Sequence, residues 1–390
     1  MTSAFDEMRI GSLVARNRIV RAATAESLAT PAGRPTTRLI GKYAELAEGG
    51  VGTIITGYAY VTQDGKPSEN ALGIYDDSFA EDYRALVDAV HARGANIVLQ
   101  LVYGGSKSRV AHDDPRRLAP DADGPTGRTP NVSILGASPV ETPKTRLTPT
   151  QATTENLREL ASAFGAATAR ARSCGFDGVE VHAAHGYLLS QFLDRRYNAR
   201  TDEYAGDTLE GRARLAVECV KAARRAADPD FPVLVKVNSC DDLEDPTGKR
   251  GGLSEEESAR VCSWLVAAGA SCIDVSGDWH AASSRNRAGE PFFADFGACL
   301  SRRLDAPVIV TGGWRNIDVI EEHMEKDGIA GVALCRPLIC EPDLVNRWRS
   351  GSREPSRCTG CGHCAEHAGI PCAIRERDGL EPASPHMSKP

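Results

Sequence analysis

Eight short apolar runs, each rich in β-branched residues and separated from the next by an amphipathic stretch, constrain the fold of this chain most. Such runs are typical of parallel strands that are buried on both faces and joined by helices. The runs that we expect to form strands are Arg18–Thr24, Val51–Tyr58, Asn96–Val102, Asp177–Ala183, Pro232–Asn238, Ser271–Gly277, Pro307–Gly313 and Gly331–Pro337. The helical patterns between them include Arg38–Glu48, Phe79–Arg93, Glu155–Ser173, Leu209–Ala226 and Glu255–Ala268.

This alternation predicts an α/β protein with a (β/α)₈ TIM barrel, in which the strands close into a ring. A doubly wound open sheet is the alternative, but it usually has fewer units and a glycine-rich first turn that we do not find in this sequence. The last of the helices named above is expected to begin with a capping box, because Ser254 precedes Glu257 by three residues.

The 390 residues fit one barrel enlarged by long loops as well as they fit two domains. Hydrophobic residues make up 41% of the chain and charged residues 25%, the composition of a globular protein with a large core. The barrel pattern is complete after Pro342–Trp348. We therefore predict a barrel domain at residues 1–350 and a C-terminal extension at residues 351–390, which contains clustered cysteines and a polar tail.

A long segment after the third expected strand, Gly104–Pro149, is rich in proline, glycine and aspartate and has little periodicity. Connections between a strand and its helix are usually only a few residues long. At the mouth of a barrel, a loop of this size is expected to cap the substrate site. A surface insertion without a role is the alternative.

The distribution of charge excludes several classes of function. The formal net charge is −7, and lysine and arginine form no basic stripe, so nucleic acid is not an expected partner. The N-terminal residues do not have the pattern of a secretory signal, and no apolar run is long enough to span a membrane. We expect a cytoplasmic protein that does not bind membranes.

Four of the twelve cysteines are clustered in the extension, as Cys358, Cys361, Cys364 and Cys372. In a reducing compartment, such a cluster favours a metal site over disulfides. Three thiolates at x₂ spacing with a remote fourth are the usual ligands of a [4Fe–4S] cluster. A zinc site is the alternative, although Cys₄ zinc more often uses two separate C-x₂-C pairs, and a set of free thiols is a third interpretation.

Polar residues inside otherwise apolar strands are the first candidates for a site, because active sites lie at the carboxyl ends of barrel strands. Gln100 and Lys236 interrupt their strands, and His182 ends the fourth. A buried ammonium needs a negative partner. A reduced flavin, with negative charge around N1 and the C2 oxygen, would be one partner for Lys236. An ion pair with Glu180 or Asp274 is an equally open alternative.

The segment after the fourth strand presents His182, His185 and Tyr187 within six residues. Two imidazoles and a phenol can polarise a carbonyl group and deliver a proton. Two histidines could instead bind zinc, but we find no third ligand at a fitting spacing.

The last two strands end in Gly312-Gly313 and in Cys335-Arg336. Barrels commonly bind phosphate at these two loops, where glycines let backbone N–H groups approach the phosphate and an arginine can pair with it.

The segment HAAHGYLLSQFLDRRYNARTDEYAGDTLEGRARL, which begins at His182, resembles the old yellow enzyme family of FMN-dependent oxidoreductases. Ile19–Thr24 and Gln100-Leu101 are weaker points of similarity, and the resemblance extends from about Phe5 to Cys372. It includes the iron–sulfur relatives 2,4-dienoyl-CoA reductase and trimethylamine dehydrogenase.

The resemblance implies that FMN lies over the mouth of the barrel. Its implied contacts are Ala23 and Thr24 near the ring, Gln100 and Lys236 at the pyrimidine, and Gly312, Gly313 and Arg336 at the phosphate, with Gly57 and Cys335 as further cofactor-binding residues. It also implies that His182 and His185 hold the activating carbonyl oxygen of the substrate and that Tyr187 is the proton donor. The sequence departs from the family at Ala25, where a group that tunes the flavin potential is common, and at Tyr103, where histidine is common.

The activity implied is reduction of an activated C=C bond, in an enone or enoyl ester, by hydride transfer from flavin N5 and protonation by Tyr187. An alternative is oxidation of an amine or a saturated carbonyl compound, but amine-oxidising relatives tend to lack the paired histidines. A third hypothesis, from another class, is a non-catalytic flavin and iron–sulfur electron-transfer subunit. A further flavin and nucleotide domain follows in the iron–sulfur relatives, so we expect electrons from NAD(P)H directly or from a separate electron-transfer protein. The oligomeric state stays open, a homo-oligomer included.

Overall fold

The computed structural model describes residues 3–108, 134–142, 148–241, 251–277 and 291–381. Within these residues, eight parallel strands pair side by side in a row. The row closes into a ring, because the strand at one end of it also pairs with the strand at the other end. In ring order they are β3 (Ile19–Arg21), β4 (Thr53–Ile55), β7 (Asn96–Val102), β10 (Gly178–Ala183), β11 (Val233–Asn238), β12 (Cys272–Ser276), β13 (Val308–Thr311) and β14 (Gly331–Leu334). The predicted (β/α)₈ barrel is confirmed, and each strand falls inside a predicted run.

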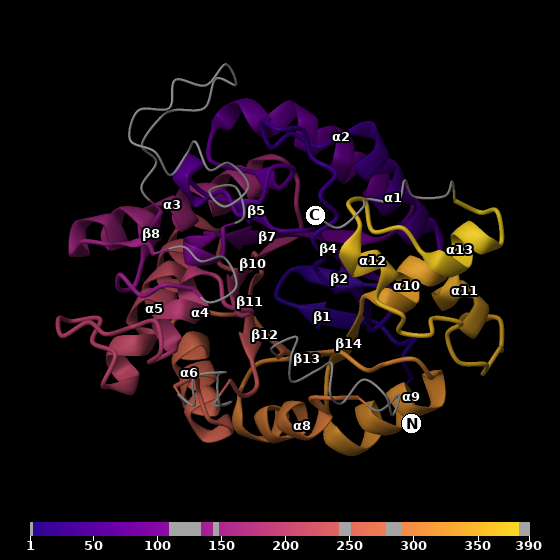
Figure 1. The fold of residues 1–390 in the computed structure, drawn as a ribbon. Helices are drawn as coiled ribbons and strands as arrows, with labels where there is room; N and C mark the ends of the chain where they lie inside the picture. Colours follow the sequence, from indigo (N-terminus) through magenta and orange to yellow (C-terminus); the bar gives the residue numbers. More distant parts are fainter. Residues whose placement is uncertain (1–2, 109–133, 143–147, 242–250, 278–290, 382–390) are drawn as a thin grey trace.

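Helices surround the ring of strands (Figure 1). They are α1 (Thr37–Glu48), α2 (Ala80–His91), α3 (Thr154–Ser173), α5 (Leu209–Ala226), α6 (Glu255–Ala267), α8 (Ala294–Arg303), α9 (Ile317–Asp327) and α11 (Leu344–Arg349). The predicted capping box of α6 is present, because the Glu257 N–H donates to Ser254 Oγ and the Ser254 N–H donates to the Glu257 carboxylate. None of the helices in the described part of the chain is long and apolar enough to cross a membrane.

The hairpin of β1 (Met8–Ile10) and β2 (Leu13–Ala15) closes the amino-terminal end of the barrel. Its buried side chains share one apolar cluster with strand residues that point into the barrel, such as Val98 and Leu234. This end is therefore filled by hydrocarbon, and the polar strand residues lie further along, toward the carboxyl ends.

Several short elements shape the carboxyl-terminal mouth. They are β5 (Ala59–Tyr60), η1 (Gln63–Gly65), β6 (Leu72–Gly73), η2 (Asp77–Phe79), η3 (Gly105–Lys107), β8 (Leu135–Gly136), β9 (Thr150–Gln151), α4 (Leu188–Leu193) and α10 (Arg336–Cys340). Strand β8 pairs with β9, which ties the end of the long loop to the start of α3. The middle of the predicted cap, residues 109–133 and 143–147, lies outside the described residues, so the cap stays a prediction.

The extension carries α12 (His363–Glu366) and α13 (Ala373–Arg377) and lies beside α1, α10 and α11 (yellow in Figure 1). The Gly369 N–H donates to the Glu26 carbonyl at 2.7 Å, and Arg375 binds Glu45 at 2.8 Å. These contacts join the extension to the loop after β3 and to α1, close to the mouth of the barrel.

Candidate active site

Five neighbouring strands, β7 and β10 to β13, contribute a polar cluster to the barrel interior. Gln100 on β7 donates to Glu180 on β10, and Lys236 on β11 donates to Asp274 on β12. The ammonium of Lys236 also lies 3.8 Å from Glu180, while Thr311 Oγ1 donates to Asp274 at 2.7 Å. The parallel register explains the cluster, because it places Glu180 beside Gln100 and Lys236 beside Asp274 on adjacent strands.

The ionisation of this cluster follows from burial and from its internal pairs. Burial opposes the charge of Lys236, but Asp274 and Glu180 outweigh burial and raise the pKa of the ammonium. Burial raises the pKa of the Glu180 carboxyl to about 8, and the charge of Lys236 acts against this shift. The sequence left open whether the negative partner of Lys236 is a flavin or a carboxylate. In the structure Lys236 is paired with the carboxylates, and Asp274 is its main counter-ion.

Glu180 Oε1 is buried and has no hydrogen-bond partner among the described residues. The Lys236 ammonium lies 3.8 Å from this atom, beyond hydrogen-bond distance, so the oxygen is able to accept a further hydrogen bond. The strands β3, β13 and β14 are largely buried, but the residues at their carboxyl ends are half-buried. These half-buried residues are Ala23, Thr24, Thr311, Gly312, Gly313, Cys335 and Arg336.

The turn after β10 brings the two histidines and the tyrosine together. His185 has a φ of 59° and Gly186 a φ of 74°, and this left-handed turn leads directly into α4. The ring centroid of His182 lies 5.1 Å from that of His185 and 4.9 Å from that of Tyr187. The three groups that the sequence singled out therefore form one constellation at the carboxyl end of the barrel.

Both imidazoles are neutral near pH 7. Burial lowers the pKa of His182 and of His185 well below the ordinary value, and the charge of Lys236 acts in the same direction on both. His182 Nδ1 accepts a hydrogen bond from the Ala184 N–H at 3.3 Å, so the ring proton resides on Nε2. His185 Nε2 lies 2.9 Å from Ser276 Oγ. A neutral imidazole with Nε2–H is a hydrogen-bond donor to a carbonyl oxygen.

Two neighbours of Tyr187 were missed by the sequence reasoning. The Lys107 ammonium, at the end of η3, lies 4.7 Å from the centroid of the Tyr187 ring and donates to the carbonyl oxygen of His185. Tyr58, after β4, packs edge-on against the same ring with centroids 5.4 Å apart. The available signal for Lys107 was its position shortly after the third strand, at the active end of the barrel.

The residues predicted to bind the phosphate lie at the ends of β13 and β14. Gly312 and Gly313 have φ values of 113° and 85°, a conformation that favours glycine and exposes backbone N–H groups. Thr24 Oγ1 lies 3.2 Å from Cys335 Sγ, so the ends of β3 and β14 meet there. Arg336 lines the cavity at the cysteine cluster, and a role toward phosphate stays a prediction.

Gly57 has a packing reason to be glycine. A Cβ at this position would lie 2.3 Å from Glu26 Oε2 and 2.6 Å from the Thr24 carbonyl oxygen. Glu26 itself is buried and paired with Arg21 at 3.2 Å. The loop after β3 can approach β4 this closely only because residue 57 has no side chain.

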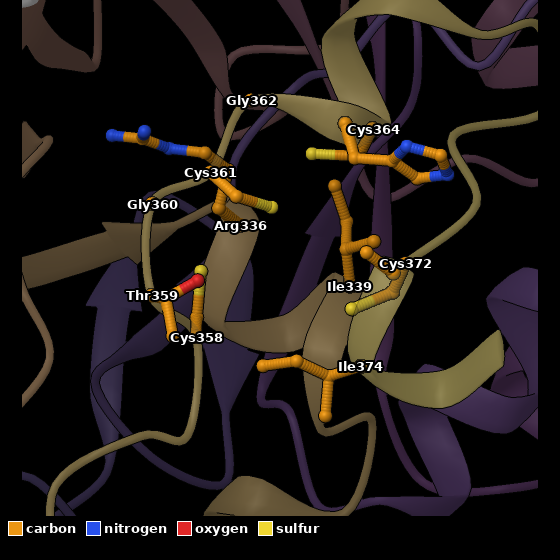
Figure 2. A pocket seen from close by; sticks show the side chains of 12 residues that line it. Arg336, Ile339, Cys358, Thr359, Gly360, Cys361, Gly362, Cys364, Cys372 and Ile374 are labelled. Atoms are coloured by element: carbon orange, nitrogen blue, oxygen red, sulfur yellow. The ribbon is translucent and has the colours of Figure 1, made fainter. Parts of the chain in front are cut away.

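The clustered cysteines line one cavity of about 290 Å³, which includes space open to solvent. Figure 2 shows the sulfurs of Cys358, Cys361, Cys364 and Cys372 around this space, with Ile339 and Ile374 on its walls. Burial raises the pKa of the Cys364 thiol to about 12. Among the described residues, no three His, Cys, Asp or Glu side chains converge closely enough for a single metal ion.

A fifth thiol lies at the cluster. Cys340, at the end of α10, packs with Cys372, and burial together with that neighbour raises the pKa of Cys340 to about 12. The spacing along the chain does not associate Cys340 with the others, because α11 lies between it and Cys358.

A closed (β/α)₈ barrel with a buried polar cluster and a His–His–Tyr constellation at its carboxyl end has the architecture of an FMN-dependent oxidoreductase. Residues 3–354 match the sequence profile of the NADH:flavin oxidoreductase / NADH oxidase family. The chain belongs to this family, the family of the old yellow enzymes. The resemblance noted in the sequence is thereby confirmed, as are FMN as the cofactor and NAD(P)H as the reductant at the level of the family.

The metal reductase of Desulforamulus reducens is 32% identical over 98% of this chain and 54% of its own length. The cinnamate reductase of Clostridium sporogenes is 29% identical over 97% of this chain and 58% of its own length. The chain therefore spans little more than half the length of these two relatives.

Two solved structures are also similar. A complex of 2-naphthoyl-CoA reductase with 2-naphthoyl-CoA has a TM-score of 0.85 and 26% identity, covering 97% of this chain and 58% of that one. Morphinone reductase has a TM-score of 0.72 and 26% identity, covering 91% of this chain and 92% of that one.

Proposed function

We propose that this protein reduces a C=C bond that is conjugated to a carbonyl group, with electrons that enter from NAD(P)H. The observation that carries the proposal is the constellation of two neutral imidazoles 5.1 Å apart with a phenol ring 4.9 Å from one of them. Bound FMN would supply the chemistry that the side chains lack, hydride transfer from N5 to the β-carbon of the substrate.

The histidines are suited to hold the substrate by its carbonyl oxygen. His182 offers Nε2–H as a neutral donor, and His185 lies beside it with Ser276 orienting its ring. Donors aimed at an oxygen that gains negative charge stabilise the enolate-like transition state. Because burial keeps both rings neutral, they remain donors without introducing a charge that would trap the product.

Tyr187 would deliver the proton to the α-carbon. Its ring is half-buried at the start of α4, so the phenol can reach both a substrate at the mouth and solvent for reprotonation. A well-placed general acid contributes on the order of 10²–10⁴ in rate.

The same strand ends are proposed to bind FMN. Gln100 and Lys236 would face the polar edge of the flavin ring, beside the unsatisfied oxygen of Glu180. The remaining proposed contacts are Ala23, Thr24 and Gly57 near the ring and Gly312, Gly313, Cys335 and Arg336 toward the phosphate.

The substrate class is proposed from the constellation together with the similar proteins. A cinnamate reductase and a structure with bound 2-naphthoyl-CoA are among them, and both names describe unsaturated carbon conjugated to a carboxyl or thioester carbonyl. Tyr58 and Tyr187 add an aromatic wall beside the histidines. We therefore propose enones and enoyl esters as substrates, in preference to amines.

A [4Fe–4S] cluster is proposed for the extension, held by the four clustered cysteines. The support is the spacing, three cysteines two residues apart with a remote fourth, together with the position of all four side chains on the wall of one cavity. The exposed Cys361 would bring the cluster close to solvent, where a separate electron-transfer protein could dock. The barrel would then be the catalytic domain at residues 1–350, and residues 351–390 the electron-transfer extension.

The proposal is tested by anaerobic titration of the photoreduced holoprotein with enones, enoyl thioesters and amines. Conjugated carbonyl compounds are expected to reoxidise the flavin stoichiometrically and to yield the saturated product. Reduction of the oxidised flavin by an amine, with no reoxidation by any conjugated carbonyl compound, would contradict the proposal. A chain that binds flavin but reacts with none of these compounds would instead be an electron-transfer subunit.

A further inference from the structure

Lys107 lies against the part of the site that handles the proton. Its ammonium is 4.7 Å from the centroid of the Tyr187 ring and also donates a hydrogen bond to the backbone carbonyl of His185. One side chain from η3 thus contacts both the phenol ring and the turn that carries it. The nearby Gly105 backbone packs on Gln191 of α4, which keeps η3 close to the start of that helix.

Among the described residues whose contacts with the Tyr187 ring are known, the titratable groups other than Lys107 carry no charge. His182, from β10, is neutral because burial lowers its pKa, and Tyr58, after β4, is a phenol. Lys236 is held by Asp274 in the interior of the barrel. Among the described contacts of the Tyr187 ring, Lys107 therefore supplies the positive charge.

We propose that Lys107 is a positioning residue for proton transfer, which stabilises the negative charge that the Tyr187 oxygen acquires as its proton leaves. This inference rests on the proposed function, in which Tyr187 protonates the α-carbon. In that step the phenolic O–H bond breaks and an α-C–H bond forms, while hydride from the reduced flavin supplies the electron pair for the β-C–H bond. The phenolate that remains is reprotonated from solvent.

The magnitude follows from the separation of the charges. The Lys107 ammonium lies 4.7 Å from the centroid of the Tyr187 ring, and a unit charge this close to a half-buried phenolate ring favours the anion by an amount that corresponds to a pKa shift on the order of one unit. One unit is a tenfold change in the ratio of the two protonation states. An acid that is stronger by this amount should protonate the substrate up to about tenfold faster.

A purely structural role would produce a different pattern. If Lys107 only anchored η3 through the His185 carbonyl, its removal would shift the turn and would affect binding of the substrate as well as proton transfer. Lys66 provides a matched control, because its ammonium lies 5.8 Å from the centroid of another ring, Tyr60, and hydrogen-bonds to the Pro31 carbonyl at 2.6 Å.

The test is a spectroscopic titration of Tyr187 in the FMN-loaded protein, read as tyrosinate absorbance after subtraction of the matching Tyr187→Phe titration. We expect Lys107→Met and Lys107→Gln to raise the pKa of the Tyr187 phenol by about one unit, Lys107→Arg to restore it, and Lys66→Met to leave it unchanged. In stopped-flow experiments the Met and Gln variants should lose up to about tenfold in the rate of flavin reoxidation by an enone, with little change in the apparent dissociation constant of the enone.

An unchanged phenol pKa in both Lys107→Met and Lys107→Gln would overturn the inference, as would an equal change in Lys66→Met. Weaker enone binding with an unchanged pKa would assign Lys107 a structural role. The titration of the phenol does not depend on catalysis, so failure of the proposed function can be recognised separately. If Tyr187 is not the proton donor, Tyr187→Phe will leave flavin reoxidation unaffected, whatever the effect of Lys107 on the phenol pKa.

Discussion

The basic side chains at the barrel mouth differ in charge, because each has a different environment. His182 and His185 are neutral because they are buried, whereas Lys236 stays charged in the same interior because two carboxylates outweigh its burial. The sequence identified all three residues, since each is a polar residue within or directly after an apolar strand. It could not assign the partner of Lys236, because that depends on which residue of the next strand lies beside it.

The role of Lys236 can be separated from its ion pair. Lys236→Met leaves Asp274 without its main counter-ion, and removal of one partner of a buried pair typically costs about 3–5 kcal/mol in the free energy of unfolding. The double variant Lys236→Met/Asp274→Asn should recover most of that loss. We expect FMN binding to remain weakened, or the flavin potential lowered, in the double variant as well, because the cation near the reduced flavin is still missing.

Chemical denaturation and a redox titration of the same three proteins measure both quantities. Normal FMN content together with a normal potential in the double variant would mean that Lys236 serves the ion pair alone.

Elements were predicted well where burial dictates the pattern. Strands that are covered on both faces must be apolar throughout, so β7 and β11 are plain in the sequence, and α6 begins where Ser254 and Glu257 form its capping box. Elements that depend on turns were not foreseen. The left-handed conformation at His185 and the helical turn η3 arise from tertiary contacts, and they bring Lys107 onto Tyr187. The site residues on the strands and in the segment directly after β10 were therefore predictable, and Lys107 was not.

The whole molecule joins a complete barrel to an extension that adds its own cavity. The extension contacts the loop after β3 through Gly369 and Glu26, and the cysteine cavity includes Arg336, the first residue of α10. Cys335, the preceding residue, touches Thr24 at the mouth. Cys335, at the proposed FMN site, and Arg336, at the proposed iron–sulfur site, are therefore adjacent in the chain. The spacing of the cysteines alone did not reveal that the two sites are so close.

Iron analysis tests this arrangement at the level of the molecule. Protein purified without oxygen is expected to contain about four irons per chain and a broad visible absorbance that bleaches with dithionite. Cys361→Ser should lower the iron content but leave FMN in the barrel, because the two sites have separate ligands. Cys299→Ser, at a thiol on α8, is the matched control and should retain both groups. One zinc per chain and no iron would contradict the proposed cluster.

The central claim, that Tyr187 protonates the substrate in a reaction driven by FMN, is tested most directly by following both half-reactions of Tyr187→Phe in stopped-flow experiments. Reduction of the flavin by NAD(P)H needs no proton donor on the substrate side, so its rate should stay close to that of the wild type. Reoxidation by an enone should slow by about 10²–10⁴-fold. Tyr103→Phe, which removes a phenol bonded to Asp64 at 2.6 Å, should slow neither half-reaction. Equal slowing of both half-reactions in Tyr187→Phe, or no slowing of reoxidation, would contradict the account.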